Sequence, residues 1–242
     1  YDKYNSRIFK GILKKYTEIF TQDENSEKEL KKIGVDRALY IGNLKFNRAK
    51  IQKKEKYNNK KLINYLGDDK CIVFGSTWAR DEEIIFEYIS EKINKNVKYI
   101  IAPHDVSEKN ISRIKSKLNN KVNLLSDYIY NAQSNILIVN SIGVLKYLYK
   151  FSDISYVGGG FKKKGLHNIL EPCVYGNPVI FGKYFKFSNE AKALIKLKGG
   201  FSVQNSRQLK STVNELLFNA NKLKEIKIIN SKFIDDNLVS IN

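Results

Sequence analysis

The chain has 242 residues, which is enough for one large domain with a substantial core. No apolar run reaches the roughly 18 residues of a membrane span, so we expect the chain itself to be soluble. The two cysteines, Cys71 and Cys173, form no CxxC pair, which excludes a disulfide framework or zinc site as the leading interpretation.

The formal net charge is +18, from 43 basic and 25 acidic residues. Such an excess favours anionic partners: nucleic acid, anionic lipid or phosphorylated substrates. The lysines are scattered rather than gathered in one tract, which equally fits a general compositional bias. We therefore predict no nucleic-acid partner.

The first 32 residues are predicted to be helical, because apolar residues from Ile8 to Phe20 recur at intervals of three and four. The other face of this helix is basic, and it fits either a solvated surface or a membrane-facing one. A second helix is predicted from Ser26 to Gly34 and a short strand at 38–42. Residues 46–68 are polar and charged without a clear apolar face, so we predict a linker between two structural bodies.

From residue 69 onward, predicted strands and helices alternate. The strands are expected at 71–74, 98–102, 122–125, 136–139, 154–157, 179–181 and 201–203, and the helices at 81–95, 107–118, 144–150, 188–198 and from 206 to the end. This alternation predicts an α/β fold with a doubly wound, Rossmann-like parallel sheet. In such sheets the ligand lies beyond the carboxyl ends of the strands, here the loops 75–78, 103–105, 140–143 and 158–167.

The most informative stretch is Tyr156–Gly182, which predicts a strand, three glycines, a basic loop, a short helix opening at His167 and Asn168, and a second strand. Glycines let the backbone approach a ligand closely, and the free N–H groups of a helix start suit a phosphate. Glu171, one turn further, could accept hydrogen bonds from ribose hydroxyls. An ordinary strand-to-helix loop with solvated lysines explains the spacing equally well.

The two histidines also have two interpretations each. His104 either contacts a phosphate or caps a helix, and His167 either supports an anion site or caps the helix that follows it. The acidic clusters at 68–69, 81–83 and 235–236 are interpreted as a turn, a helix start and a tail. We assign them no metal.

Several motifs, taken in order along the chain, resemble one known family. They are Ile41–Phe46 (IGNLKF), Gly75–Thr77 (GST), Ala102–His104 (APH), Gly143 ahead of Leu148 and Tyr149, Asp153, and the stretch 156–182 (YVGGGF, HNILEP, GNPVIFG). Together they resemble the 3-deoxy-D-manno-octulosonic acid (Kdo) transferases, glycosyltransferases of the two-domain GT-B type. The resemblance implies that residues 69–242 form a C-terminal CMP-sugar-binding domain and residues 1–45 the end of an N-terminal acceptor domain, with 46–68 between them.

The resemblance also implies a function and a set of binding residues. The function is transfer of Kdo from CMP-Kdo to a lipid A precursor (lipid IVA) in lipopolysaccharide synthesis, at the cytoplasmic face of the inner membrane and without a cofactor or metal. The implied CMP contacts are Pro103, His104, Gly143, Val144, Leu145, Asn168, Ile169, Leu170 and Glu171.

The chain departs from the family pattern at three positions. His104 stands where arginine is common, Val144 where an acidic residue is frequent, and Leu166 where the family often has glycine. The family's catalytic glutamate and membrane-associating segment precede the point that Tyr1 matches, so we assign no catalytic base. The absence of methionine suggests a processed product or a fragment. Two alternative functions stay open: a UDP-sugar-dependent glycosyltransferase or epimerase, and a basic nucleic-acid-binding module.

Overall fold

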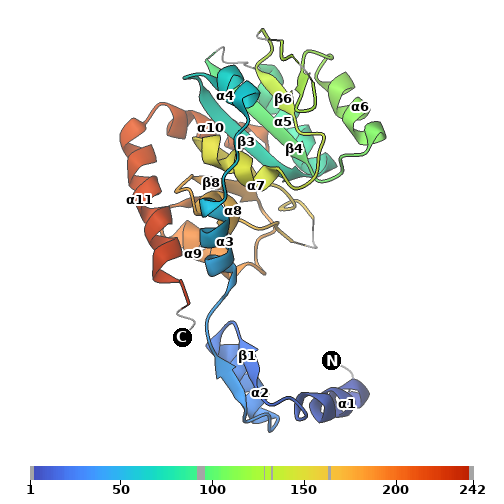
Figure 1. Ribbon diagram of the computed structural model, residues 1–242, viewed down its shortest axis with the longest axis vertical. Coiled ribbons are helices and arrows are strands. Elements are labelled where there is room, and N and C mark those ends of the chain that lie inside the picture. The colour runs from blue at the N-terminus through green and yellow to red at the C-terminus, as the bar shows by residue number, and fades with distance from the viewer. Residues whose placement is uncertain (1–2, 92–95, 128, 132, 163–164, 240–242) are drawn as a thin grey trace.

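A computed structural model describes residues 3–91, 96–127, 129–131, 133–162 and 165–239 (Figure 1). The end of the helix predicted at 81–95 lies outside these residues. Figure 1 shows a large α/β body with a small N-terminal lobe below it, and the C-terminal end of the chain returns towards that lobe.

The large body is built on a seven-stranded, fully parallel sheet with the order β5-β6-β4-β3-β7-β8-β9. Its strands are β3 (Lys70–Thr77), β4 (Val97–Pro103), β5 (Asn123–Leu124), β6 (Ile136–Ile138), β7 (Ile154–Val157), β8 (Val179–Gly182) and β9 (Gly200–Val203). The first strand of this sheet along the chain is β3. The chain next forms β4, β5 and β6 on one side of β3, and then β7, β8 and β9 on its other side. The topological switch point therefore lies between β3 and β7, which is where such sheets bind ligands.

Helices cover both faces of this sheet. One face is covered by α5 (Ala79–Glu91), α6 (Glu108–Lys117) and α10 (Ser206–Leu217). The other is covered by α3 (Lys45–Lys54), α4 (Lys60–Leu66), α7 (Leu145–Leu148), α8 (Leu170–Cys173) and α9 (Asn189–Lys196), while α11 (Ala220–Asp236) packs against both cores. Successive residues of a strand point to opposite faces, so Cys71 and Val73 enter one core and Ile72 and Phe74 the other. The predicted doubly wound parallel fold is confirmed.

The N-terminal lobe contains α1 (Lys3–Leu13), β1 (Ile19–Thr21), α2 (Glu24–Lys32) and β2 (Ala38–Tyr40), with β1 and β2 paired in parallel. The predicted helix up to Phe20 is wrong at its end, because Ile19 and Phe20 form a strand beside Ala38 and Leu39. The spacing of the apolar residues fits a helix, but pairing with β2 overrides it.

The segment 46–68, predicted to be a linker without an apolar face, is largely helical. Phe46 and Ala49 of α3, and Leu62 and Leu66 of α4, are buried in the core of the large body. Phe46 contacts Phe233 of α11 edge to face, with ring centroids 5.3 Å apart. The expectation that this segment lacks an apolar face is therefore wrong, while the division of the chain at residues 45 and 68 stays a prediction.

Candidate functional site

Three loops meet at the carboxyl edge of the sheet next to the switch point. Trp78 follows β3, His104 follows β4, and His167 ends the long loop after β7. Their rings form a stack with centroids 4.1 Å apart for Trp78 and His104 and 4.8 Å apart for His104 and His167. The Lys162 ammonium lies 3.1 Å from the centre of the Trp78 ring. The edge thus carries an aromatic cluster with a cation against it.

One hydrogen bond defines the protonation state of His167. Trp78 Nε1–H donates to His167 Nε2 at 2.8 Å, so that nitrogen carries no proton and the neutral ring holds its proton on Nδ1. Burial, followed by the neighbouring His104 and Lys162, lowers the pKa of His167, and Asp81 opposes this shift. His167 can therefore offer an Nδ1–H donor, but it is not set up as a permanent cation.

Asp81 joins the loops beneath this stack. Its carboxylate is 0% exposed and accepts from Trp78 N–H at 2.9 Å, Tyr156 O–H at 2.7 Å and Gly159 N–H at 3.0 Å. These donors come from the loop after β3, from β7 and from the glycine loop. The interpretation of Asp81 as a plain helix-start residue misses this role, because its partners at 156 and 159 are far away in the sequence.

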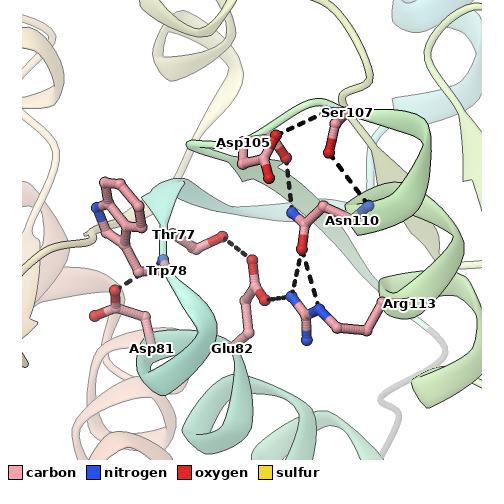
Figure 2. A network of polar contacts seen from close by, with 8 residues as sticks. All are labelled: Thr77, Trp78, Asp81, Glu82, Asp105, Ser107, Asn110 and Arg113. Carbon is pink, nitrogen blue, oxygen red and sulfur yellow. Dashed lines mark hydrogen bonds and ion pairs between the residues drawn. The ribbon is translucent and has the colours of Figure 1, made fainter.

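A second polar network holds the loop that carries His104 (Figure 2). Buried Glu82 accepts from Thr77 Oγ1 at 3.1 Å and pairs with Arg113 of α6. Arg113 Nε donates to Asn110 Oδ1 at 3.0 Å, and Asn110 Nδ2 donates to the backbone oxygen of Asp105 at 2.7 Å. The residue after His104 is therefore tied through α6 to the start of α5.

The backbone at the switch point leaves little room for side chains. A Cβ on Gly158 would lie 2.2 Å from the Ser76 carbonyl oxygen, so glycine is required for the close approach of the two loops. Ser76 itself has φ +52°, next to a β-bulge between Gly75 and Thr77. Bulges of this kind re-aim side chains near binding sites, and this one precedes Trp78.

The predicted helix start at His167 and Asn168 needs correction. The helix α8 begins only at Leu170 and has four residues, and Asn168 Oδ1 accepts from Leu170 N–H at 3.2 Å. His167 is therefore not its cap, just as Ser107 rather than His104 caps α6. So short a helix has little macrodipole, and any phosphate contact here must rest mainly on individual N–H groups and side chains.

Glu171 lies half-buried among polar neighbours. Burial raises the pKa of its carboxyl group, while the Asn168 hydrogen bond and the charges of Arg48 and Lys146 act in the opposite direction. Asn168 Nδ2 lies 3.3 Å from Glu171 Oε1. The carboxylate thus lies between cations of α3 and α7.

The remaining predicted contacts occupy the same edge of the sheet. Pro103 is buried at the end of β4 in register with Thr77. Val144 and Leu145 are partly buried at the start of α7, and the Leu145 side chain approaches Gly75. Gly143 is exposed with φ +86°, and a Cβ there would meet no other atom within 4 Å. The structure brings His104 against His167 and Asn168 against Glu171.

A cavity of ≈ 410 Å³ adjoins Asn168. Besides residues 165–170 its walls include Lys45 and Arg48 of α3, and the aromatic residues Tyr184, Phe185 and Phe187 that follow β8. Sequence reasoning missed these residues. Lys45 belongs to the motif Ile41–Phe46, but Arg48 lies in the segment expected to be a linker, so no signal marked it.

For metal sites and membrane-spanning helices, the structure can be compared with the sequence-based expectation only at the described residues. There, no group of three or more His, Cys, Asp or Glu residues is placed to hold a metal ion. No helix in the same part is both long enough and apolar enough to span a bilayer.

No protein-family model matches the sequence. A 3-deoxy-D-manno-octulosonic acid transferase of Rickettsia prowazekii is 31% identical over 96% of this chain and 51% of that protein. A bifunctional glycosyltransferase/methyltransferase of Fusobacterium nucleatum is 32% identical over all of this chain and 39% of that protein. The C-terminal CMP-Kdo binding domain of WaaA from Acinetobacter baumannii superposes with a TM-score of 0.65 and 22% identity, covering 78% of this chain and 98% of that domain.

The fold defines the class of protein, and the sequence identity defines the family within that class. The parallel sheet and its neighbours define a Rossmann-like domain of the kind found in the C-terminal half of GT-B glycosyltransferases. Within that class, the chain is a relative of the Kdo transferases, as its motifs predicted. It spans about half the length of the relative from Rickettsia prowazekii.

Proposed function

We propose that this chain is the donor-binding part of a Kdo transferase and binds CMP-Kdo at the carboxyl edge of the seven-stranded sheet. The observation that carries the proposal is the convergence at this edge of His104, Asn168 and Glu171, three of the predicted CMP contacts, each beside a cation or a second donor. Residues 69–242 form the donor domain in this proposal, and residues 1–45 belong to the acceptor side.

The nucleotide would lie with its ribose hydroxyls donating to Glu171 and its phosphate near His167 and Asn168. Transfer of the sugar leaves CMP with a growing negative charge on its phosphate. The Nδ1–H of His167, the ammonium of Lys162 and nearby N–H groups are suited to stabilise that charge. Asp81 fixes the loops after β3 and β7, which carry Trp78, Lys162 and His167, so little reorganisation is needed when the bond breaks.

The whole reaction extends beyond these residues. We propose transfer to a lipid A precursor in lipopolysaccharide synthesis, at the cytoplasmic face of the inner membrane. The catalytic base and the membrane contact would belong to the part of the relatives' length that this chain does not span. The Kdo transferase relatives support the reaction class. The acceptor and the location rest on the family resemblance.

Titration calorimetry with CMP tests the proposal. Replacing Glu171 with Ala should weaken CMP binding by about 1–3 kcal/mol, because a hydrogen-bonded carboxylate is lost. Glu87→Ala is the matched control, since this exposed glutamate lies in α5 on the other face of the sheet, and it should leave the affinity unchanged.

Two comparisons complete the experiment. UDP should bind at least about tenfold more weakly than CMP; a preference for UDP would favour a UDP-sugar enzyme instead. Oligonucleotide binding that falls steeply with salt and does not compete with CMP would favour the nucleic-acid module. Equal CMP affinity for the wild type and Glu171→Ala would contradict the assigned role of Glu171.

A further inference from the structure

The cavity beside Asn168 extends beyond the predicted CMP contacts. Of those contacts, only Asn168, Ile169 and Leu170 line it, whereas Glu171, His104 and Gly143 do not. Its volume of ≈ 410 Å³ falls within the range of about 300–1,000 Å³ that is usual for small-molecule sites. The cavity therefore has room for a ligand group that extends beyond the nucleotide.

The cations of this cavity are available for a ligand. Within the described residues, the exposed side chain of Arg48 makes no hydrogen bond or ion pair. Lys45 Nζ lies 3.9 Å from Glu190 Oε1, a long ion pair in which the lysine side chain is 57% exposed and the glutamate side chain 16% exposed. Glu190 already accepts from Asn43 Nδ2 at 3.0 Å and Ser188 Oγ at 3.0 Å, so its charge is held without Lys45.

Another part of the wall is aromatic and solvent-exposed. Phe187 is 92% exposed and Tyr184 is 40% exposed, although both border a cavity. Large apolar side chains exposed at the rim of a polar cavity are typical of ligand grooves. Together with the cations, they suit a ligand that has both a negative charge and an apolar ring face.

We propose that this cavity is the subsite for a sugar acid carried by the nucleotide donor. The sugar carboxylate binds the guanidinium of Arg48, with Lys45 beside it, and the ring lies against Phe187 and Tyr184. Glu190 accepts hydrogen bonds from ring hydroxyls. Arginine suits this task because its planar fork can donate two parallel hydrogen bonds to one carboxylate. The inference rests on the proposed binding of CMP-Kdo and extends it to the recognition of the sugar.

The test compares two ligands on the 242-residue chain. CMP contains only the nucleotide, whereas CMP-Kdo adds the sugar acid, so the ratio of their dissociation constants measures the sugar subsite alone. We expect the wild type to prefer CMP-Kdo, and Arg48→Gln to lower that preference by about tenfold. Because the charge of Arg48 also acts on Glu171, its loss can change the affinity for CMP itself, and the ratio of the two dissociation constants removes that shared effect. Arg48→Lys keeps the charge without the fork and should show an intermediate preference.

Arg207→Gln is the matched control, because Arg207 is an exposed arginine on α10 at the other face of the sheet. Its preference should equal that of the wild type. A wild type that binds CMP and CMP-Kdo equally, or an Arg48→Gln variant with an unchanged preference, would overturn the sugar-acid subsite and leave the nucleotide site standing. A chain that binds neither ligand would overturn both.

Discussion

The buried carboxylate of Asp81 offers the sharpest test of how the candidate site is held together. Asp81→Asn keeps the shape of the side chain and removes its charge, whereas Asp81→Ala removes the acceptors altogether. In the wild type one carboxylate oxygen accepts from Trp78 N–H and Gly159 N–H, and the other accepts from Tyr156 O–H. The two variants therefore separate the effect of charge from the effect of hydrogen bonding.

The expected magnitudes follow from these three bonds. In Asp81→Asn the amide oxygen can still accept from both backbone groups, and the Tyr156 hydroxyl can rotate to accept from the new amide. Three charge-assisted bonds become neutral ones, while the desolvation cost of a buried charge disappears, so the free energy of unfolding should fall by about 1–3 kcal/mol. Asp81→Ala leaves two N–H groups and one hydroxyl unpaired in the interior. At about 1–3 kcal/mol for each of these three groups, the loss should be about 3–9 kcal/mol.

Trp78 makes the measurement direct, because it is the single tryptophan of the chain and its own N–H is one of the three donors. Urea unfolding followed by tryptophan fluorescence and by far-UV circular dichroism gives both the stability and the local environment. The exposed Glu83 on the same helix is the control, and Glu83→Gln should cost less than about 0.5 kcal/mol. If Asp81→Asn and Asp81→Ala were equally destabilising, or if both cost less than about 1 kcal/mol, the three-way connection would not hold the loops as described.

Three further predictions concern pH, backbone packing and the connection of α3. The pKa of His167 is lowered from 6.5, so the unfolded chain binds more protons just below that pH; stability should fall as the pH drops below about 6.5, and His167→Asn should remove that part of the slope. An unchanged slope in this variant would contradict the half-buried, neutral imidazole. Gly158→Ala should lower the free energy of unfolding in urea by about 3 kcal/mol, because the new Cβ would collide with the Ser76 carbonyl. Gly143→Ala, the control, should lower it by only about 1 kcal/mol. Equal losses would refute the close approach of the two loops. Phe46→Ala should cost about 3–5 kcal/mol in the same assay and Ile51→Ala, which is exposed, less than about 0.5; a small loss for Phe46→Ala would mean that α3 is a linker after all.

The sheet was predictable because its information is local. The apolar runs at Cys71–Phe74 and Ile154–Val157 are short, buried on both sides and followed by turn residues, which is the pattern of central parallel strands. The segment at 46–68 was not predictable in this way. In α3, Lys50 pairs with Asp235 and Lys53 Nζ donates to the backbone oxygen of Val174, so these two lysines have partners far along the chain. The polar composition of this segment therefore did not indicate that it forms a packed helix.

The candidate site likewise contains some residues that the sequence indicates and others that only the fold brings together. The resemblance pointed to His104 and Glu171, since motifs keep residue types at fixed positions. The residues that hold and extend the site depend on tertiary contacts: Trp78 meets His167, 89 residues away, and Asp81 meets Gly159, 78 residues away. Arg48 was missed because its helix was missed. In this protein the sequence motifs indicated the proposed ligand class, and only the fold shows which groups position the proposed contacts.

The two proposed parts of the donor site use different kinds of positive charge. On the phosphate side, Lys162 lies over Trp78. His167 is a neutral hydrogen-bond donor there, so its interaction with a phosphate can change with pH. On the sugar side, the guanidinium of Arg48 offers a planar pair of donors for a carboxylate. In a nucleotide-linked 2-ulosonic acid the phosphate and the carboxylate are attached to the same anomeric carbon, so both anions must lie within one sugar ring of each other. Asn168 lines the cavity and contacts Glu171, so it stands where both requirements meet.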